Sequence, residues 1–197
     1  MKPNSPLTLQ VIREEHRALA AMLRSVPLLL AELRRRQARP DFAALRAMLF
    51  YLDEFPERLH HPKESELLFP KLRARAPEIR SVLDRLDEDH QRGERAIRDL
   101  EHALLGFELM GESRRAAFEQ MAERYVHGYL QHMQIEEVQV LPLAQQMFAP
   151  DDWAELDEAF ARNRDPLAGH AVDEPYRALF QTVLNALPAP LGLGPAL

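Results

Sequence analysis

The stretch that decides the fold runs from Phe118 to Val140 and reads FEQMAERYVHGYLQHMQIEEVQV. Apolar and aromatic side chains recur in it every three or four residues, which is the spacing of one face of an α-helix. His132 and Glu136 fall on this same stripe. The stretch therefore predicts a long amphipathic helix whose buried face carries an imidazole and a carboxylate.

Three further stripes with the same period precede it in the chain. Their members are Leu9, Ile12, His16, Leu19 and Leu23; Leu45, Met48, Leu49, Leu52 and Phe55; and Leu83, Leu86, His90, Ile97, Leu100 and Leu104. Breaks that contain proline or glycine separate the stripes, near residues 38–41, 69–77, 110–113 and 148–151. Four long amphipathic helices with short connections predict an all-α fold, an up-and-down four-helix bundle.

We expect this bundle to span residues 1–148 and a C-terminal helical extension to span residues 149–197. Two short helices are predicted in the extension, at 151–164 and 176–187. The last ten residues, 188–197, are rich in proline and glycine and are expected to lie extended along the surface or to fray. The two short helices could cap the bundle or form a homodimer contact, and the sequence leaves both alternatives open.

Local signals predict where the long helices begin and bend. Asp41 and Ser113 are expected N-caps, because a short side-chain oxygen can accept a free amide of the first turn. Pro27, Pro56 and Pro62 fall inside predicted helices. Interior proline removes a backbone hydrogen bond, so we expect bends there rather than domain boundaries.

Composition limits the chemistry that the chain can perform. It has no cysteine, which excludes disulfides, thiolate metal sites and a thiol nucleophile. A net charge of −6 argues against a nucleic-acid partner. The sequence starts without the apolar core of a signal peptide, and its apolar stretches are too short to cross a bilayer. We therefore expect a cytoplasmic protein with no membrane partner.

Four of the eight histidines lie on apolar stripes, one on each predicted helix: His16, His60, His90 and His132. Glu64 and Glu136 follow His60 and His132 by four residues, and residues at this spacing share a helix face. Four imidazoles and two carboxylates in one core suit iron, manganese or zinc, and a carboxylate can bridge two ions. A single histidine on such a face is more often a hydrogen-bonded core residue, so the prediction depends on the whole set.

These segments resemble the hemerythrin-like, histidine–histidine–glutamate (HHE) cation-binding family. The segments are Glu15-His16-Arg17, His60-His-Pro-Lys-Glu-Ser-Glu-Leu-Leu-Phe-Pro70, Asp89-His-Gln-Arg-Gly93 and His132-Met-Gln-Ile-Glu-Glu-Val-Gln-Val-Leu-Pro142. The resemblance implies two non-haem iron ions bridged by carboxylates and by an oxo or hydroxo group. It also implies the ligands His16, His60, Glu64, His90, His132 and Glu136.

The chain departs from the oxygen-carrying members of that family in one respect. Those members carry a fifth histidine one turn along the third helix, where this chain has Glu94. Glu94 could coordinate a metal or stay at the rim as a solvated charge. Glu137 stands where those members place a carboxylate, although Glu136 mirrors Glu64 better. His61 is expected on a polar side with Glu57, where a place beside the site or at the surface is favoured over the alternative of a metal ligand.

The resemblance implies a metal-binding protein that binds or senses dioxygen, nitric oxide or peroxide, or buffers iron. A metal- or oxygen-binding protein is favoured over an enzyme. The alternative is a ferritin-like di-iron carboxylate oxidase or iron-storage protein, in which Glu-x-x-His pairs supply ligands. The chain has one such spacing at an inward histidine, Glu57 with His60. His102, His127 and His170 are expected to be solvated, and Tyr125 and Tyr129 to pack in the core.

Overall fold

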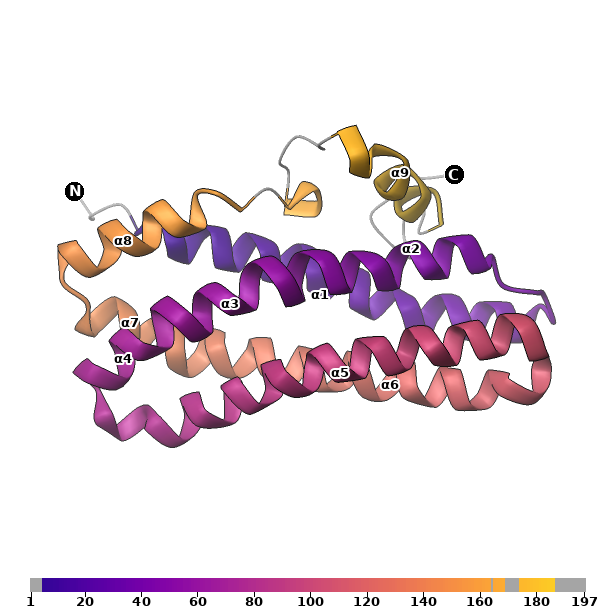
Figure 1. The fold of residues 1–197 in the computed structure, drawn as a ribbon, viewed down its shortest axis with the longest axis horizontal. Coiled ribbons are helices and arrows are strands. Elements are labelled where there is room, and N and C mark those ends of the chain that lie inside the picture. The colour runs from indigo at the N-terminus through magenta and orange to yellow at the C-terminus, as the bar shows by residue number, and fades with distance from the viewer. Residues whose placement is uncertain (1–4, 164, 169–173, 187–197) are drawn as a thin grey trace.

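The computed structural model describes residues 5–163, 165–168 and 174–186, and four long helical rods form its body (Figure 1). The first rod is α1 (Leu7–Arg35) and the third is α5 (Arg80–Met110). The second and fourth rods each join several helical segments end to end. The second consists of α2 (Phe42–Leu52), η1 (Asp53–His60), α3 (His61–Lys63), η2 (Glu64–Leu68) and α4 (Phe69–Arg75). The fourth consists of α6 (Glu112–Ile135), η4 (Glu136–Val140) and α7 (Leu141–Met147).

Short connections between the rods confirm the predicted up-and-down bundle. Asp41 caps α2, and its side chain accepts from the backbone N–H of Ala44 over 3.1 Å. A 3₁₀ turn, η3 (Pro77–Ile79), leads into α5. The prediction for Ser113 is wrong: its hydroxyl donates to the carbonyl of Met110. The chain turns instead at Gly111, whose φ of 73° favours glycine, so α6 has already begun when it reaches Ser113.

The segments η1, η2 and η4 are π-helical, and they lie where the second and fourth rods carry their glutamates. A π turn closes i to i+5 hydrogen bonds and therefore takes more residues than an α turn. Pro56 lies inside η1 and Pro62 lies at the start of α3, so the prolines of the second rod fall in this widened region. At Pro27 the helix α1 continues without a break.

Two apolar cores lie on either side of a polar layer in the bundle. The larger core includes Met22, Met48, Leu104 and Phe118 and lies toward the α5–α6 turn. The smaller core includes Leu9, Phe69, Leu86 and Val140 and lies toward α4, α7 and α8. Burying each such side chain contributes about 1.5–3 kcal/mol. Polar side chains between two such layers are therefore held by packing from both ends.

The chain after the fourth rod lies over the first and second rods (Figure 1). It contains α8 (Pro150–Phe160), η5 (Pro166–Ala168), η6 (Glu174–Tyr176) and α9 (Arg177–Ala186), so both predicted short helices are present. Helix α8 packs on α1, and α9 packs on α2. The backbone and hydroxyl of Thr8 both donate to Asp157 Oδ1, over 2.7 and 2.6 Å. The division at residue 148 stays a prediction, and residues 188–197 lie outside the described part.

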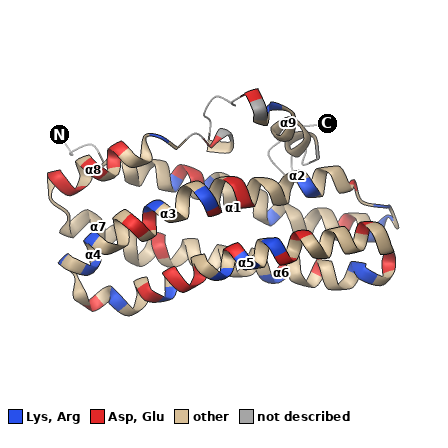
Figure 2. Cartoon of the chain, in the orientation of Figure 1, with Lys and Arg blue, Asp and Glu red and all other residues tan. Residues whose placement is uncertain are grey.

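Acidic and basic side chains are interspersed along the rods (Figure 2). Many form pairs one helical turn apart, such as Arg92 with Asp89 and Arg98 with Glu94. Within the described ranges, every helix is too short or too polar to cross a membrane.

Candidate metal centre

The six side chains predicted as ligands converge in the polar layer of the bundle. His16 comes from α1, His60 and Glu64 from the second rod, His90 from α5, and His132 and Glu136 from the fourth rod. All six are buried, and Glu64 and Glu136 are 0% exposed. The structure thus brings together residues that are up to 120 positions apart, as the four stripes predicted.

The two carboxylates stand between two groups of imidazoles. One oxygen of Glu64, Oε1, lies 3.2 Å from His60 Nε2, and its other oxygen, Oε2, lies 3.7 Å from His90 Nε2. Glu136 repeats the arrangement, with Oε2 3.4 Å from His16 Nε2 and Oε1 3.1 Å from His132 Nε2. We call His16 and His60 the His60 half of the centre, and His90 and His132 the His90 half.

The carboxylate oxygens have no hydrogen-bond partner among the described residues. This holds for both oxygens of Glu64, both oxygens of Glu136 and the Nε2 atom of His60. Buried charged groups without partners are costly, and a cation would remove that cost. Buried His and Glu groups that could hold a metal ion are His16, His60 and Glu64, and separately His61, Glu64, His90 and His132. The donor set of imidazole and carboxylate therefore fits a metal site.

The family comparison agrees with this geometry. The model of the hemerythrin HHE cation-binding domain matches residues 7–144. The chain belongs to the hemerythrin HHE cation-binding domain family. The searches of curated proteins and of solved structures found no match. The matched range contains all six predicted ligands of the HHE domain and stops before α8.

The four imidazoles of the centre face the carboxylates through Nε2. Each of them makes a second contact through Nδ1. His60 Nδ1 donates to Glu15 Oε2 over 2.6 Å, and His16 Nδ1 lies 3.3 Å from Glu137 Oε1. Such partners fix the ring and leave the other nitrogen free for a metal. Glu137 is 44% exposed, so it lies at the edge of the centre and contacts His16 from outside.

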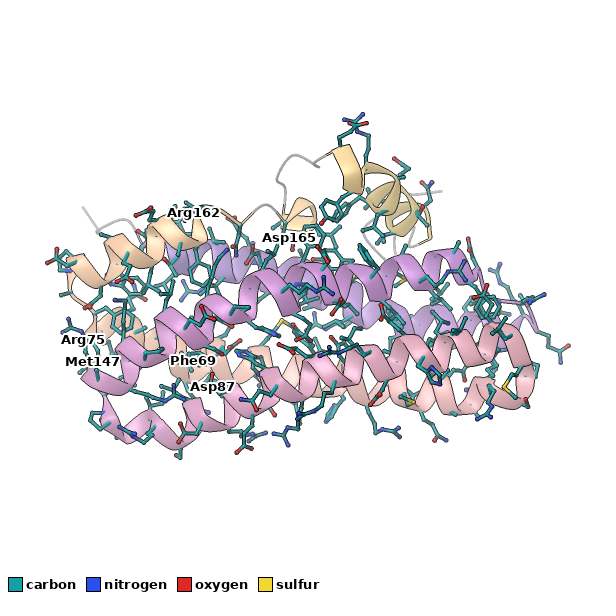
Figure 3. All side chains as sticks on the ribbon, viewed as in Figure 1. Phe69, Arg75, Asp87, Met147, Arg162 and Asp165 are labelled. Atoms are coloured by element: carbon teal, nitrogen blue, oxygen red, sulfur yellow. The ribbon has the colours of Figure 1, made fainter. Side chains whose placement is uncertain are left out.

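The His90 half has outer partners of a different kind. His90 Nδ1 donates to Ser65 Oγ over 2.8 Å, and the Ser65 hydroxyl donates to Asp87 Oδ1 over 2.6 Å. Arg73 in turn pairs with Asp87, so this relay ends at the surface of α5. Asp87 is labelled in Figure 3 on that rod. His132 Nδ1 lies 3.8 Å from Asp89 Oδ2.

The expectation that His61 and Glu57 face a polar side is wrong. His61 is 6% exposed and Glu57 is 2% exposed, and His61 stacks on His90 with 4.0 Å between ring centroids. The error came from applying the α-helical period of 3.6 residues across η1, where a π turn takes more residues. Both side chains therefore turn inward beside the His90 half.

A hydrogen-bonded network holds His61 in that position. Tyr129 donates its hydroxyl to His61 Nε2 over 2.7 Å, and His61 Nδ1 lies 3.0 Å from Glu57 Oε2. Tyr125 donates to Glu57 Oε1 over 2.9 Å. Both tyrosines are buried, as expected for core packing, but their hydroxyls also bind the polar layer.

Glu94 lies away from the six converging side chains. Its side chain is 58% exposed and pairs with Arg98 one turn along α5. Glu94 thus occupies the rim position, one of the two alternatives that its sequence position left open. His102 and His127 are exposed as expected, and His170 lies outside the described residues.

Without a metal, some imidazoles of the core have raised pKa values and retain their protons. Burial lowers the pKa of the His60 imidazole, but the charges of Glu64 and Glu15 outweigh it and hold that pKa well above its usual value. In the same way, burial is outweighed by Glu136 at His132, whose pKa is raised to about 10. Burial and the charge of His132 lower the pKa of His90 to about 3. Metal binding would thus displace protons from His60 and His132.

Two residues of the centre were missed in the sequence. Glu15 is 6% exposed and contacts His60, although its spacing from Ile12 and Leu19 already placed it on the apolar stripe. Asn163 is 3% exposed and donates from Nδ2 to Glu15 Oε2 over 3.0 Å. Asn163 lies in the connection after α8, where no periodicity exists, so no sequence signal could have placed it beside the metal centre.

Proposed function

We propose that this chain is a hemerythrin-like non-haem di-iron protein. In this proposal His16 and His60 hold one ion, and His90 and His132 hold the other. Glu64 and Glu136 bridge the two ions, because each places one oxygen at each half. His61 belongs to the same buried group, but its two nitrogens contact Tyr129 and Glu57, so in this proposal it packs on His90 rather than holding the ion.

The observation that carries this proposal is the set of four carboxylate oxygens, all buried and all without hydrogen-bond partners in the described chain. Keeping two such carboxylates in an apolar core is costly, and the neighbouring imidazoles make no hydrogen bond to them. A pair of cations would compensate them, and two bridging carboxylates offset the repulsion between the cations. Imidazole with carboxylate also suits manganese and zinc. The identity of the native metal as iron is therefore part of what we propose.

The proposed role is to bind or sense dioxygen, nitric oxide or peroxide, or to buffer iron. Bound iron would supply reversible electron exchange and a coordination position for a small ligand. The chain's own contribution is to fix the imidazoles through Glu15, Glu137 and Ser65 and to exclude bulk water with the two apolar cores. A binding role is favoured over an enzymatic one.

The ferritin-like alternative has less support. It would use the Glu57–His60 spacing as a ligand pair. Glu57 is buried, but its two oxygens bind Tyr125 and His61 rather than facing the six converging side chains. A homodimer through α8 and α9 and a cytoplasmic location stay predictions. Leu156, Phe160, Phe180 and Val183 of these helices are already buried within one chain.

Metal analysis of anaerobically purified protein tests the proposal. We expect about two irons per chain and, on exposure to air, the near-ultraviolet charge-transfer absorption of an oxidised di-iron pair. His60→Ala should lose iron and thermal stability together, because metal bound to the folded state stabilises it. His102→Ala is the matched control at an exposed histidine and should change neither. Zinc alone, or no metal, would contradict the proposal.

A further inference from the structure

A surface groove of about 510 Å³ follows the outer seam between α5 and α6, near the turn that joins them and away from the metal centre. Its lining residues on α5 recur every three or four positions from Asp99 to Met110, which is the spacing of one helix face. On α6 they extend from Arg114 to Met121. Because the eleven residues from Asp99 to Met110 rise by roughly 16 Å, Asp99 and Arg114 lie at opposite ends of the groove.

The middle of this seam groove exposes apolar side chains. Leu105, Leu109 and Met110 are 48%, 75% and 58% exposed, and all three line it. Single exposed apolar residues are ordinary on a protein surface, but a group of them in one concavity is typical of an interaction site. Gly106 lies among them, and a Cβ added there would meet no atom within 4 Å, so the floor of the groove is open.

The two ends of the seam groove carry opposite charges that stay unpaired. Asp99 and Arg114 are both exposed, and neither forms an ion pair with any residue that the structure describes. Their sequence neighbours behave differently, since Arg98 and Arg115 each pair with a glutamate one turn away on the same helix. An acidic and a basic side chain are therefore available for an outside partner, one at each end of an apolar surface.

We propose that a second copy of this chain covers the seam groove in an antiparallel, two-fold dimer. A two-fold interface uses the same surface on both copies, so that surface must complement itself. When the axis crosses the middle of the groove, each end meets the opposite end of the other copy. Asp99 then faces the partner's Arg114 at one end, and Arg114 faces the partner's Asp99 at the other. Leu109, the most exposed of the three apolar side chains, enters the open floor of the other groove.

The size of the surface sets the strength of the dimer. Ten residues of the described chain line the groove, whereas a standard stable interface has about 20–30 residues on each side. The dimer is therefore weak and dissociates on dilution. It also differs from the α8–α9 contact predicted from the sequence, because the seam groove is lined by α5 and α6 alone within the described residues.

Sedimentation of the full chain at increasing concentration tests the proposal. A range from about 1 µM to about 1 mM covers the dissociation constants of weak interfaces, and the wild-type chain should pass reversibly from monomer to dimer within it. Leu109→Glu should raise the dissociation constant about tenfold or more, because its carboxylate would lose water in the apolar centre of the contact. Leu28→Glu is the matched control: Leu28 is 52% exposed on α1, outside the groove, and its substitution should leave the dimer unchanged.

A charge exchange tests the two-fold pairing itself. Asp99→Arg alone and Arg114→Asp alone each place like charges at both ends of the contact, so each variant should raise the dissociation constant about tenfold. In an equimolar mixture of the two variants, the new arginine of one chain meets the new aspartate of the other. The unchanged Arg114 and Asp99 meet at the opposite end. The mixture should therefore associate as tightly as the wild-type chain.

The other outcomes would overturn the dimer. If the wild-type chain stays monomeric at about 1 mM, no second copy occupies the groove, and its occupant is a different molecule. If Leu109→Glu associates as tightly as Leu28→Glu, the dimer uses another surface, such as α8 and α9. A mixture that associates no better than either charge variant alone would contradict the two-fold pairing. These measurements do not depend on iron content, so the di-iron proposal is tested separately.

Discussion

The two halves of the metal centre have similar inner groups and different surroundings. In each half, two imidazoles face one oxygen of Glu64 and one of Glu136. A segment from outside the HHE domain lies over the His60 half, and the cavity beside them measures about 20 Å³. A separate surface pocket of about 520 Å³ is lined by His16 and Glu137. The His90 half borders two surface pockets, one of about 170 Å³ between α5 and α6 and one of about 220 Å³ beside His61.

This difference has a simple physical origin. A four-helix bundle presents a different pair of rods on each side, and here the C-terminal segment packs on the first and second rods. Asp165, labelled in Figure 3, lies where that segment passes over these rods. The pair α5 and α6 is left uncovered there. A nearly symmetric set of side chains thus has the C-terminal segment over one side only.

The largest effect is expected from Glu136→Ala, because Glu136 serves both halves. Iron content should fall from about two per chain to near zero. The stabilisation by bound metal should be lost with it, which is about 4 kcal/mol at a thousandfold excess of metal over its dissociation constant. Metal analysis and thermal unfolding with and without iron measure both quantities. If one iron stayed bound at wild-type affinity, Glu136 would not bridge the halves.

A smaller effect that separates the halves is expected from their outer partners. Glu15→Gln removes the carboxylate at His60 Nδ1, and Ser65→Ala removes the acceptor at His90 Nδ1. Each should weaken one of the two metals by about 10–100-fold and spare the other. Competition with a chelator, followed as two separate release steps, measures this. Equal weakening of both metals by either variant would contradict the division into halves.

The cover over the His60 half should make stability depend on pH. Burial raises the pKa of Asp165 to about 6, and the hydrogen bond from Tyr51 offsets only part of that effect. Ionising Asp165 in the folded chain therefore costs stability. This cost is absent below the ordinary pKa of 3.8, grows as the pH rises, and is fully present above about 6.

Asp165→Asn isolates this contribution, because asparagine does not titrate. The free energy of unfolding of the metal-free wild-type chain, relative to Asp165→Asn, should fall by on the order of 1 kcal/mol between pH 5 and pH 7.5. Urea unfolding at the two pH values measures it. Asp157→Asn, in α8, is the control, because it loosens the same segment. The difference in free energy of unfolding between this variant and the wild type should vary less with pH. A difference for Asp165→Asn that grew with pH would contradict the assigned direction.

The smallest effect is expected from Glu94→Ala. Glu94 is 58% exposed and paired only with Arg98. The substitution should leave the iron content unchanged and alter the free energy of unfolding by less than about 0.5 kcal/mol. Loss of iron from the His90 half would show that Glu94 is a ligand and would add a difference between the inner groups of the two halves.

The sequence predicted the features that depend on regular helical spacing. The apolar stripes located the four rods, and His16, His90 and His132 were buried where the period of 3.6 placed them. The period failed at η1, so Glu57 and His61 were assigned to the wrong side. Asn163 could not be found at all, because a contact between a loop and Glu15 leaves no local pattern in the sequence.

The hydrogen bond between Glu15 and Asn163 has a consequence for biosynthesis. It joins residues 148 positions apart, whereas the His90 half needs no residue beyond Glu136. During translation the His90 half can therefore assemble before the cover of the His60 half exists. At about 5–20 residues per second, the interval is on the order of seconds. If the chain binds iron as proposed, the His60 half of a nascent chain lacks its cover for that time, and Asn163 reaches Glu15 only afterwards.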